Sequence, residues 1–193
     1  MHKLTRDDLL TLEAYARERP ALRGEVIAHK RRRTVHLGEH LSVVFEDRRS
    51  VQYQIQEMLR IERIFEAAGI QDELDAYNPL IPDGSNLKAT LLVQYDDPAQ
   101  RARELQKLRG LEDHIGLQVG DERVSAIADE DMDRSNAHKT SAVHFLRFEL
   151  SPAMLAAWND ARHPVVLRSA HPACPVAVTL SSDQRRALAA DFR

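Results

Sequence analysis

The chain has 193 residues, of which 43% are hydrophobic and 30% are charged, and its formal net charge is −3 at pH 7. This length predicts one domain over residues 1–193, with the N-terminal helices of residues 5–33 either part of it or an appendage to it. Nucleic-acid-binding proteins usually carry a basic excess, so the charge argues against that class. One cysteine, Cys174, excludes an intrachain disulfide and favours a cytoplasmic location. No signal peptide is visible, and no apolar run approaches the length of a membrane span.

The N-terminal region predicts two helices. Thr5 followed by two aspartates is typical of a helix start, and this helix is expected to run to about Arg19. Pro20 fits the first turn of a second helix that reaches about Arg33. The basic stretch at its end, residues 29–33, is interpreted as a solvated helix C-terminus that complements the helix dipole.

A hairpin, a helix and a loop are expected next. The hairpin covers residues 34–47, with Gly38 near its turn. The helix covers residues 50–68, and Gly69 is interpreted as its C-terminal stop. Residues 75–86 are rich in Asn, Pro, Asp and Gly, which predicts a loop of a length that is often functional.

Short strands dominate the rest of the chain. Because they outnumber the buried helices and are joined by short turns, we expect an α+β fold. This fold is a largely antiparallel β-sheet with packed α-helices, an N-terminal helical pair and a C-terminal helix. The expected elements are strands at 87–95, 115–119, 123–128, 141–150, 165–168 and 176–180, helices at 97–110 and 151–161, a loop at 129–139, and a last helix capped by Ser181 or Ser182.

Two polar residues interrupt the apolar arc of the helix at 50–68. Glu57 and Gln54 both fall among apolar side chains when residues are placed 100° apart. A buried carboxylate needs a partner, because an unpaired buried charge costs several kcal/mol. The strand at 141–150 has two mostly apolar faces, which predicts cover on both sides, and it places His144 on one face and Arg147 on the other. We therefore expect a charge-assisted pair between Glu57 and one of these residues, which either fixes packing or forms a ligand or metal pocket.

The loop at 75–86 and the strand after it supply a second set of polar side chains. They form either a hydrogen-bonded turn with an exposed strand edge or a ligand-binding loop docked against the Glu57 helix. Together, the candidate binding residues are Gln54, Glu57, Arg60, Asn78, Asp83, Asn86, Lys88, His144 and Arg147.

The metal-site motifs are incomplete. Asp129, Asp131 and Asp133 match the first three positions of an EF-hand, but Arg134 replaces the required glycine and Thr140 the bidentate glutamate. This segment is therefore either a loose divalent-cation site or a solvated acidic turn.

Histidine and cysteine spacing adds no complete site. His36 and His40 flank a glycine in the predicted hairpin, so helical metal-pair geometry does not apply to them. His171 and Cys174 alone cannot complete a tetrahedral zinc site or justify haem ligation. No cofactor is evident from the sequence.

Two long segments carry a family resemblance. They read FEDRRSVQYQIQEMLRIERIFEAAGIQDELDAYNPLIPDGSNLKATL over 45–91 and KTSAVHFLRFELSPAML over 139–155. Both resemble the bacterial family called domain of unknown function 3501, and the resemblance covers nearly the full chain. It implies no reaction. Members are commonly encoded near rubrerythrin-like proteins and a cysteine-rich iron–sulfur oxidoreductase, which implies a role beside redox proteins of peroxide defence and oxidative stress.

Three hypotheses follow. The first is a cytoplasmic accessory or binding protein whose partners are the iron–sulfur oxidoreductase and the rubrerythrin-like protein. The second is a small enzyme in which Glu57 or His144 is the acid or base and Lys88 or Arg147 holds an anionic substrate. The third is a structural subunit in which the same residues only stabilise the core.

Overall fold

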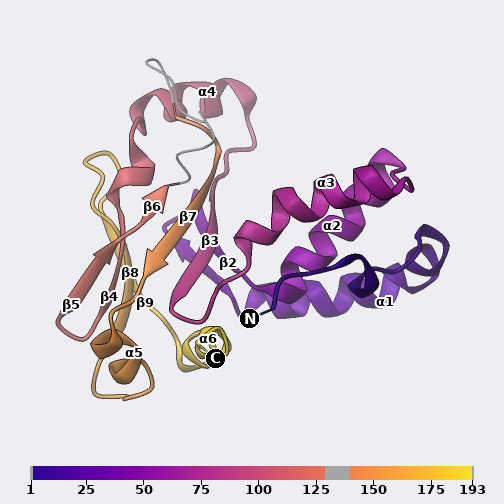
Figure 1. Ribbon diagram of the computed structural model, residues 1–193. Helices are drawn as coiled ribbons and strands as arrows, with labels where there is room; N and C mark the ends of the chain where they lie inside the picture. The colour runs from indigo at the N-terminus through magenta and orange to yellow at the C-terminus, as the bar shows by residue number, and fades with distance from the viewer. Residues whose placement is uncertain (1, 129–139, 193) are drawn as a thin grey trace.

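A sandwich of two β-sheets and a helical arm make up the fold (Figure 1). The computed structural model describes residues 2–128 and 140–192. The helical arm consists of the N-terminal segment and the first three helices. The helices are α1 (Leu12–Arg31), α2 (Arg48–Glu62), α3 (Ala67–Tyr77), α4 (Pro98–Lys107), α5 (Pro152–Trp158) and α6 (Ser182–Ala189), with 3-10 turns at Arg6–Asp8, Asn78–Leu80 and Leu111–His114.

Every hydrogen-bonded strand pair within the described residues is antiparallel, which confirms the predicted α+β class. Over residues 2–128 and 140–192, the sheets contain five and four strands. The five-stranded sheet has the order β1 (Thr34–Leu37), β2 (Leu41–Glu46), β3 (Asn86–Val93), β7 (Val143–Glu149) and β6 (Ile127–Ala128), and the four-stranded sheet has the order β5 (Glu122–Ser125), β4 (Ile115–Val119), β8 (Val165–Ser169) and β9 (Val176–Thr179).

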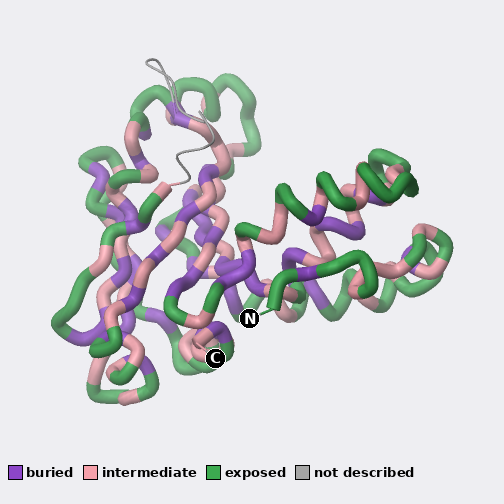
Figure 2. Tube along the Cα trace, viewed as in Figure 1, coloured by how far each residue is buried: buried purple, intermediate pink, exposed green. Residues whose placement is uncertain are grey.

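Alternating side chains of both sheets fill one shared core. On β3 the inward residues Leu87, Ala89 and Leu91 are fully buried, and on β4 Leu117 is fully buried as well. Figure 2 shows this alternation as buried and intermediate segments along the strands. Because side chains alternate across a strand, the residues between them point to the outer faces of the sandwich. On β7 the outer-face residues are half-buried, so its predicted double cover is partial.

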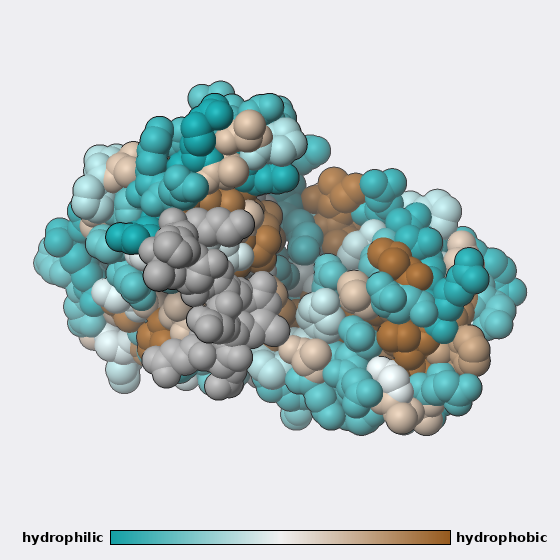
Figure 3. Space-filling view, turned by 90° about the horizontal axis from the view of Figure 1, so that it is seen from above, coloured by the Kyte–Doolittle hydropathy of each residue, from teal (hydrophilic) through white to brown (hydrophobic). Residues whose placement is uncertain are grey.

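The helical arm has a hydrophobic core of its own. Its buried residues come from the N-terminal segment, α2, α3 and the turn that follows α3. From above, the space-filling view shows a hollow between the sandwich and the arm (Figure 3). The buried arm residues are Leu4, Val51, Ile55, Leu59, Leu74 and Ile81.

Two predicted boundaries in the N-terminal region were wrong. Thr5 caps only the 3-10 turn, and Thr11 is the N-cap of α1. The predicted helix break at Pro20 does not occur, because α1 continues through it to Arg31. Pro20 is exposed, so water can satisfy the carbonyl that loses its helical partner.

The predicted helix at 50–68 is shorter than expected. Helix α2 ends at Glu62, and Arg63 adopts the left-handed conformation with φ of 56°. Gly69 lies inside α3 instead of stopping α2. A Cβ atom on Gly69 would lie 2.7 Å from Cγ2 of Ile64, so glycine is needed there for close packing. The predicted loop at 75–86 begins with the last turn of α3 and a 3-10 turn.

Candidate functional site

Glu57 contacts α1, not the sheet. Its Oε1 accepts hydrogen bonds from Tyr15 Oη and Arg19 Nε, both at 2.6 Å, and its Oε2 accepts one from Arg19 Nη2 at 2.9 Å. Arg60 Nε lies 3.5 Å from Oε1. The predicted pair with His144 or Arg147 was wrong, because α1 lies against this face of α2.

The partners of Glu57 hold it in its charged form. The hydrogen bond from Arg19 is the main cause that lowers the pKa of Glu57 to about 2. Burial and the hydrogen bond to Glu57 raise the pKa of Tyr15. Gln54, the other interruption of the apolar arc, is half-buried and makes no hydrogen bond to the residues described in 2–128 and 140–192. The hydrogen bonds of Glu57 with Tyr15 and Arg19 therefore join α2 to α1.

His144 lies in a different part of the molecule. It is buried on the inner face of β7, with its Nε2 2.9 Å from Thr140 Oγ1 and 3.0 Å from the carbonyl oxygen of Ser141. The same nitrogen lies 3.7 Å from a carboxylate oxygen of Glu112. The structure thus does not bring His144 to Glu57.

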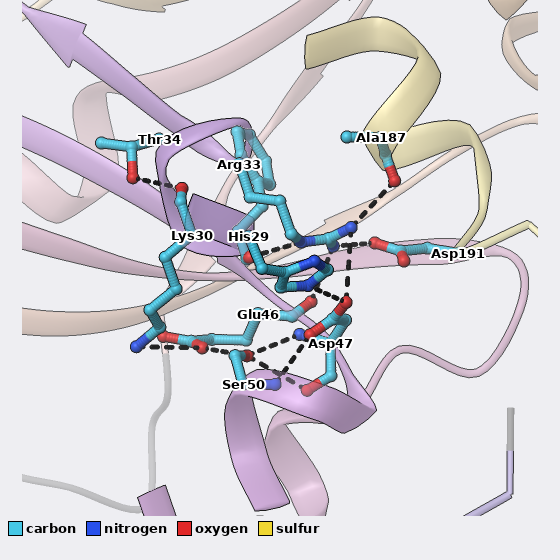
Figure 4. Close-up of polar contacts among 10 residues, drawn as sticks. His29, Lys30, Arg33, Thr34, Glu46, Asp47, Ser50, Ala187 and Asp191 are labelled. Atoms are coloured by element: carbon cyan, nitrogen blue, oxygen red, sulfur yellow. Dashed lines mark hydrogen bonds and ion pairs between the residues drawn. The ribbon is translucent and has the colours of Figure 1, made fainter. Parts of the chain in front are cut away.

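A buried arginine that the sequence reading missed lies at the junction between the arm and the sandwich (Figure 4). Arg33 was interpreted as part of a solvated basic end, but only 1% of it is exposed. Its guanidinium donates to the carbonyl oxygens of Phe45 and Ala187 at 2.9 Å each and forms an ion pair with Asp191. Five nitrogen-bound hydrogens in a planar fork suit arginine to this convergence of carbonyls and a carboxylate.

The same junction continues to the start of α2. His29 Nε2 lies 2.6 Å from Asp47 Oδ2, and Ser50 N donates to Asp47 Oδ1 at 2.8 Å. Ser50 Oγ and Thr90 Oγ1 donate to the carboxylate of Glu46 at 2.5 and 2.8 Å. We call this set, with Arg33 and Asp191, the junction cluster. It ties α1, β2, β3 and α2 to the C-terminal end of the chain.

The two carboxylates beside Arg33 differ in their pKa values. Burial raises the pKa of Asp191 to about 6, and the charge of Arg33 only partly opposes this. Burial also acts on Asp47, but the hydrogen bond from His29 and the charge of Arg33 outweigh it and lower that pKa to about 2. Asp191 Oδ1 is buried and has no hydrogen-bond partner in the described part of the chain. In the junction cluster, both carboxylate oxygens of Asp47 therefore have polar partners, whereas one oxygen of Asp191 has none among the described residues.

Four more predicted residues, Asp83, Asn86, Lys88 and Arg147, converge on the outer face of the five-stranded sheet together with Glu149, which was not predicted. Lys88 on β3 pairs in register with Arg147 on β7, and Asn86 pairs with Glu149. The amide of Asn86 donates to Asp83 Oδ2 at 2.8 Å and to Glu149 Oε1 at 3.3 Å. We call these five residues the sheet-face site. Neighbouring strands and the preceding turn bring them together, although only their separate polarity is visible in the sequence.

Asn78 anchors the N-terminal segment beside this site. Its side chain accepts a hydrogen bond from Leu4 N at 2.8 Å and donates one to the carbonyl oxygen of Leu4 at 2.9 Å. Lys3 Nζ donates to the carbonyl oxygens of Asn78 and Ile81 at 2.8 and 3.0 Å. Lys3 thereby lies close enough to Lys88 to affect its pKa.

Lys88 is the least satisfied charge of the sheet-face site. It is half-buried, and its ammonium makes no hydrogen bond or ion pair with any described residue, whereas Arg147 pairs with Glu149. Burial is the main cause that lowers the pKa of Lys88, and the charges of Arg147 and Lys3 act in the same direction. Asp83 and Glu149 oppose this shift only in part. An added anionic group would restore the balance, so the arrangement can bind a carboxylate or another anion.

The metal-site motifs gain no support from the described residues. The acidic segment of Asp129, Asp131 and Asp133 lies outside them. Between residues 2–128 and 140–192, no group of three or more His, Cys, Asp or Glu side chains is arranged to hold a metal ion. His171 Nε2 instead lies 3.1 Å from the carbonyl oxygen of Arg109. In the same residues, none of the helices has the length and apolar character of a membrane span.

The comparisons identify relatives without a known activity. The model of a family described as "Protein of unknown function (DUF3501)" matches residues 3–192. A crystal structure of a novel protein of unknown function from Burkholderia pseudomallei is 53% identical in sequence, with a TM-score of 0.93 and full coverage of both chains. No curated protein gives a significant match.

Proposed function

We propose that this chain, which belongs to the domain of unknown function 3501 family, is an accessory binding protein whose sheet-face site receives an acidic segment of a partner protein. The observation that carries this proposal is the half-buried side chain of Lys88, whose ammonium lacks a partner among the described residues. A protein gains no stability from desolvating a charge without pairing it, so such a group is better explained by a ligand.

The position of Lys88 suits a protein partner more than a deep ligand pocket. Arg147 is about two-fifths exposed, Asp83 is exposed, and the N-terminal segment borders the site through Lys3. A carboxylate that approaches along the sheet would meet two cations on adjacent strands, and Arg147 could exchange Glu149 for it. Charged groups at an accessible rim of this kind favour specificity and fast association.

The partner that we propose comes from the family resemblance. It implies a rubrerythrin-like protein and a cysteine-rich iron–sulfur oxidoreductase as companions, and the latter is the first partner to test. In this proposal the chain brings the two redox proteins together and does not itself transfer electrons.

A retention assay tests the proposal. The purified chain is immobilised, and the iron–sulfur oxidoreductase encoded beside it is passed over the surface at low and high salt. We expect binding that weakens with salt and is lost in Lys88→Gln. The matched control is Lys107→Gln, because Lys107 is exposed on α4 and, among the described residues, pairs only with Glu104. Equal retention by both variants would contradict the role of Lys88.

A second function is favoured by the lowered pKa of Lys88. A lysine that is neutral more readily than usual can act as a base or nucleophile in a small enzyme, with Arg147 holding an anionic substrate. Labelling with an amine-reactive reagent at neutral pH separates the two functions. If Lys88 reacts much faster than Lys107, the enzyme hypothesis gains support, and if it reacts at a similar rate, the binding proposal stands.

A further inference from the structure

We infer that a hollow on the outer face of the four-stranded sheet binds the phosphate group of a small phosphorylated molecule. The hollow has a volume of about 350 Å³ and is lined by β4, β5, β8 and the 3-10 turn before β4. We call it the Arg168 hollow. The Arg168 hollow is on the outward face of the four-stranded sheet, and the sheet-face site is on the outward face of the five-stranded sheet. The shared core therefore lies between them.

A glycine near the start of β4 shapes the hollow. Gly116 pairs with Ser125 on one side and with Arg168 on the other. A Cβ atom there would lie 3.3 Å from the carbonyl oxygen of Val124 and 3.7 Å from Cγ of Arg168. The first contact is tight and the second is ordinary, so the missing side chain leaves the backbone of β4 open beside the stem of Arg168. Glycine inside a strand often marks a place where a ligand approaches the backbone.

Arg168 has the properties of an anion ligand. It is half-buried, and its guanidinium makes no hydrogen bond or ion pair with any residue of 2–128 or 140–192. Arg123, one strand over, also lines the hollow, and its Nε donates to Gln118 Oε1 at 3.0 Å. The remaining guanidinium donors of both arginines have no partner in the described part of the chain, and a planar fork of N–H groups matches phosphate oxygens.

The other polar residues of the lining fit the same ligand. The hydroxyl of Ser125 can donate to an oxygen. His114 also lines the hollow, and its Nδ1 lies 2.7 Å from the carbonyl oxygen of Gly110, an acceptor that requires a hydrogen on this nitrogen. Asp113 is exposed and supplies the single carboxylate among the lining residues that are described. The lining therefore carries a cationic excess, and its volume exceeds what a bare ion fills.

Calorimetric titration of the full chain tests this inference, with inorganic phosphate and glycerol 3-phosphate as probes. We expect saturable binding of both, with tighter binding of the ester, because its glycerol part occupies the rest of the hollow. Arg168→Gln should weaken binding by about tenfold, the effect of losing one or two charge-assisted hydrogen bonds. Arg103→Gln is the matched control, since Arg103 is exposed on α4 and has no partner among the described residues.

A second variant tests the shape of the hollow separately from its charge. Gly116→Ala fills the floor of the hollow without a change in charge, and it should weaken the ester as strongly as Arg168→Gln does. Thermal unfolding shows whether either variant remains folded. The inference is overturned if the wild-type chain binds neither probe at millimolar concentration, or if Arg168→Gln and Arg103→Gln reduce binding equally, which would show general charge screening.

Discussion

Glu57 in the helical arm and Lys88 on the sheet are both half-buried charges, but their surroundings are opposite. Glu57 receives hydrogen bonds from Tyr15 and Arg19 and lies near Arg60. Lys88 receives no such partner from the described residues, and its neighbours Arg147 and Lys3 have the same charge. The fold alone explains the charge of Glu57, because its partners stabilise it. The charge of Lys88 destabilises the fold, which indicates that Lys88 has a role in binding.

The junction cluster lies between these extremes and shows how a network can be complete at one carboxylate and incomplete at the next. Asp47 is surrounded by His29, Ser50 and Arg33. Asp191 has Arg33 on one oxygen and nothing described on the other. Substitutions in these regions separate charges that stabilise the fold from charges that do not.

Removal of Arg33 should have the largest effect on stability. Arg33→Ala leaves Asp191 and Asp47 buried without their shared cation, a loss that typically costs about 3–5 kcal/mol. Urea denaturation measures the free energy of unfolding. Arg186→Ala is the control, because that arginine is 77% exposed on α6 and should change stability by less than about 0.5 kcal/mol. Similar values for both variants would show that the junction cluster contributes little.

The unsatisfied carboxylate of the junction cluster should give a smaller, pH-dependent effect. Asp191 has a pKa of about 6 in the folded chain, above its ordinary value of 3.8, so the folded state prefers the protonated form. Its contribution to stability must then fall as pH rises from about 4 through about 6. As pH rises through this range, the unfolding free energy of the wild type should fall relative to that of Asp191→Asn. A constant difference would place the pKa of Asp191 near its ordinary value.

Glu57 should show the reverse dependence, with a still smaller amplitude because it is partly exposed. Its pKa of about 2 is below the ordinary value of 4.5, so its stabilising effect is complete above about pH 4.5 and disappears as pH falls toward 2. Melting temperatures of the wild type and Glu57→Gln should differ at pH 7 and converge at low pH. Glu18→Gln, an exposed change on α1, should match the wild type throughout.

The contrast between Glu57 and Lys88 also explains what sequence reasoning could reach. Alternation predicted β4 and β8 within one residue, and Gly38, with φ of 74°, marked the turn of the first hairpin. These features depend on neighbours in the chain. The helical pattern likewise indicated that Glu57 needs a partner, but an angle around a helix does not say which element packs there. The partner, Arg19, lies on α1, a helix that continues through Pro20.

The burial of Arg33 and the assembly of the sheet-face site both depend on contacts between distant segments. Arg33 is buried by residues as far along the chain as Asp191, and the sequence around it reads as a basic helix end. Lys88 and Arg147 were each identified as polar residues on strands, but their pairing requires the register of β3 against β7. Likewise, the wide apolar arc of α2 was misleading, because Ile61 is 57% exposed.

Replacement of Lys88 should have the smallest effect on stability and the clearest effect on binding. Lys88→Met retains the half-buried aliphatic stem and removes an ammonium that no described residue pairs with, so the free energy of unfolding should change by less than about 0.5 kcal/mol or increase slightly. The same variant should lose the acidic partner, whereas Lys107→Met should retain it. If Lys88→Met instead destabilised the chain by about 2 kcal/mol or more, Lys88 would resemble Glu57, and the structural-subunit hypothesis would account for the sheet-face site better than a binding function does.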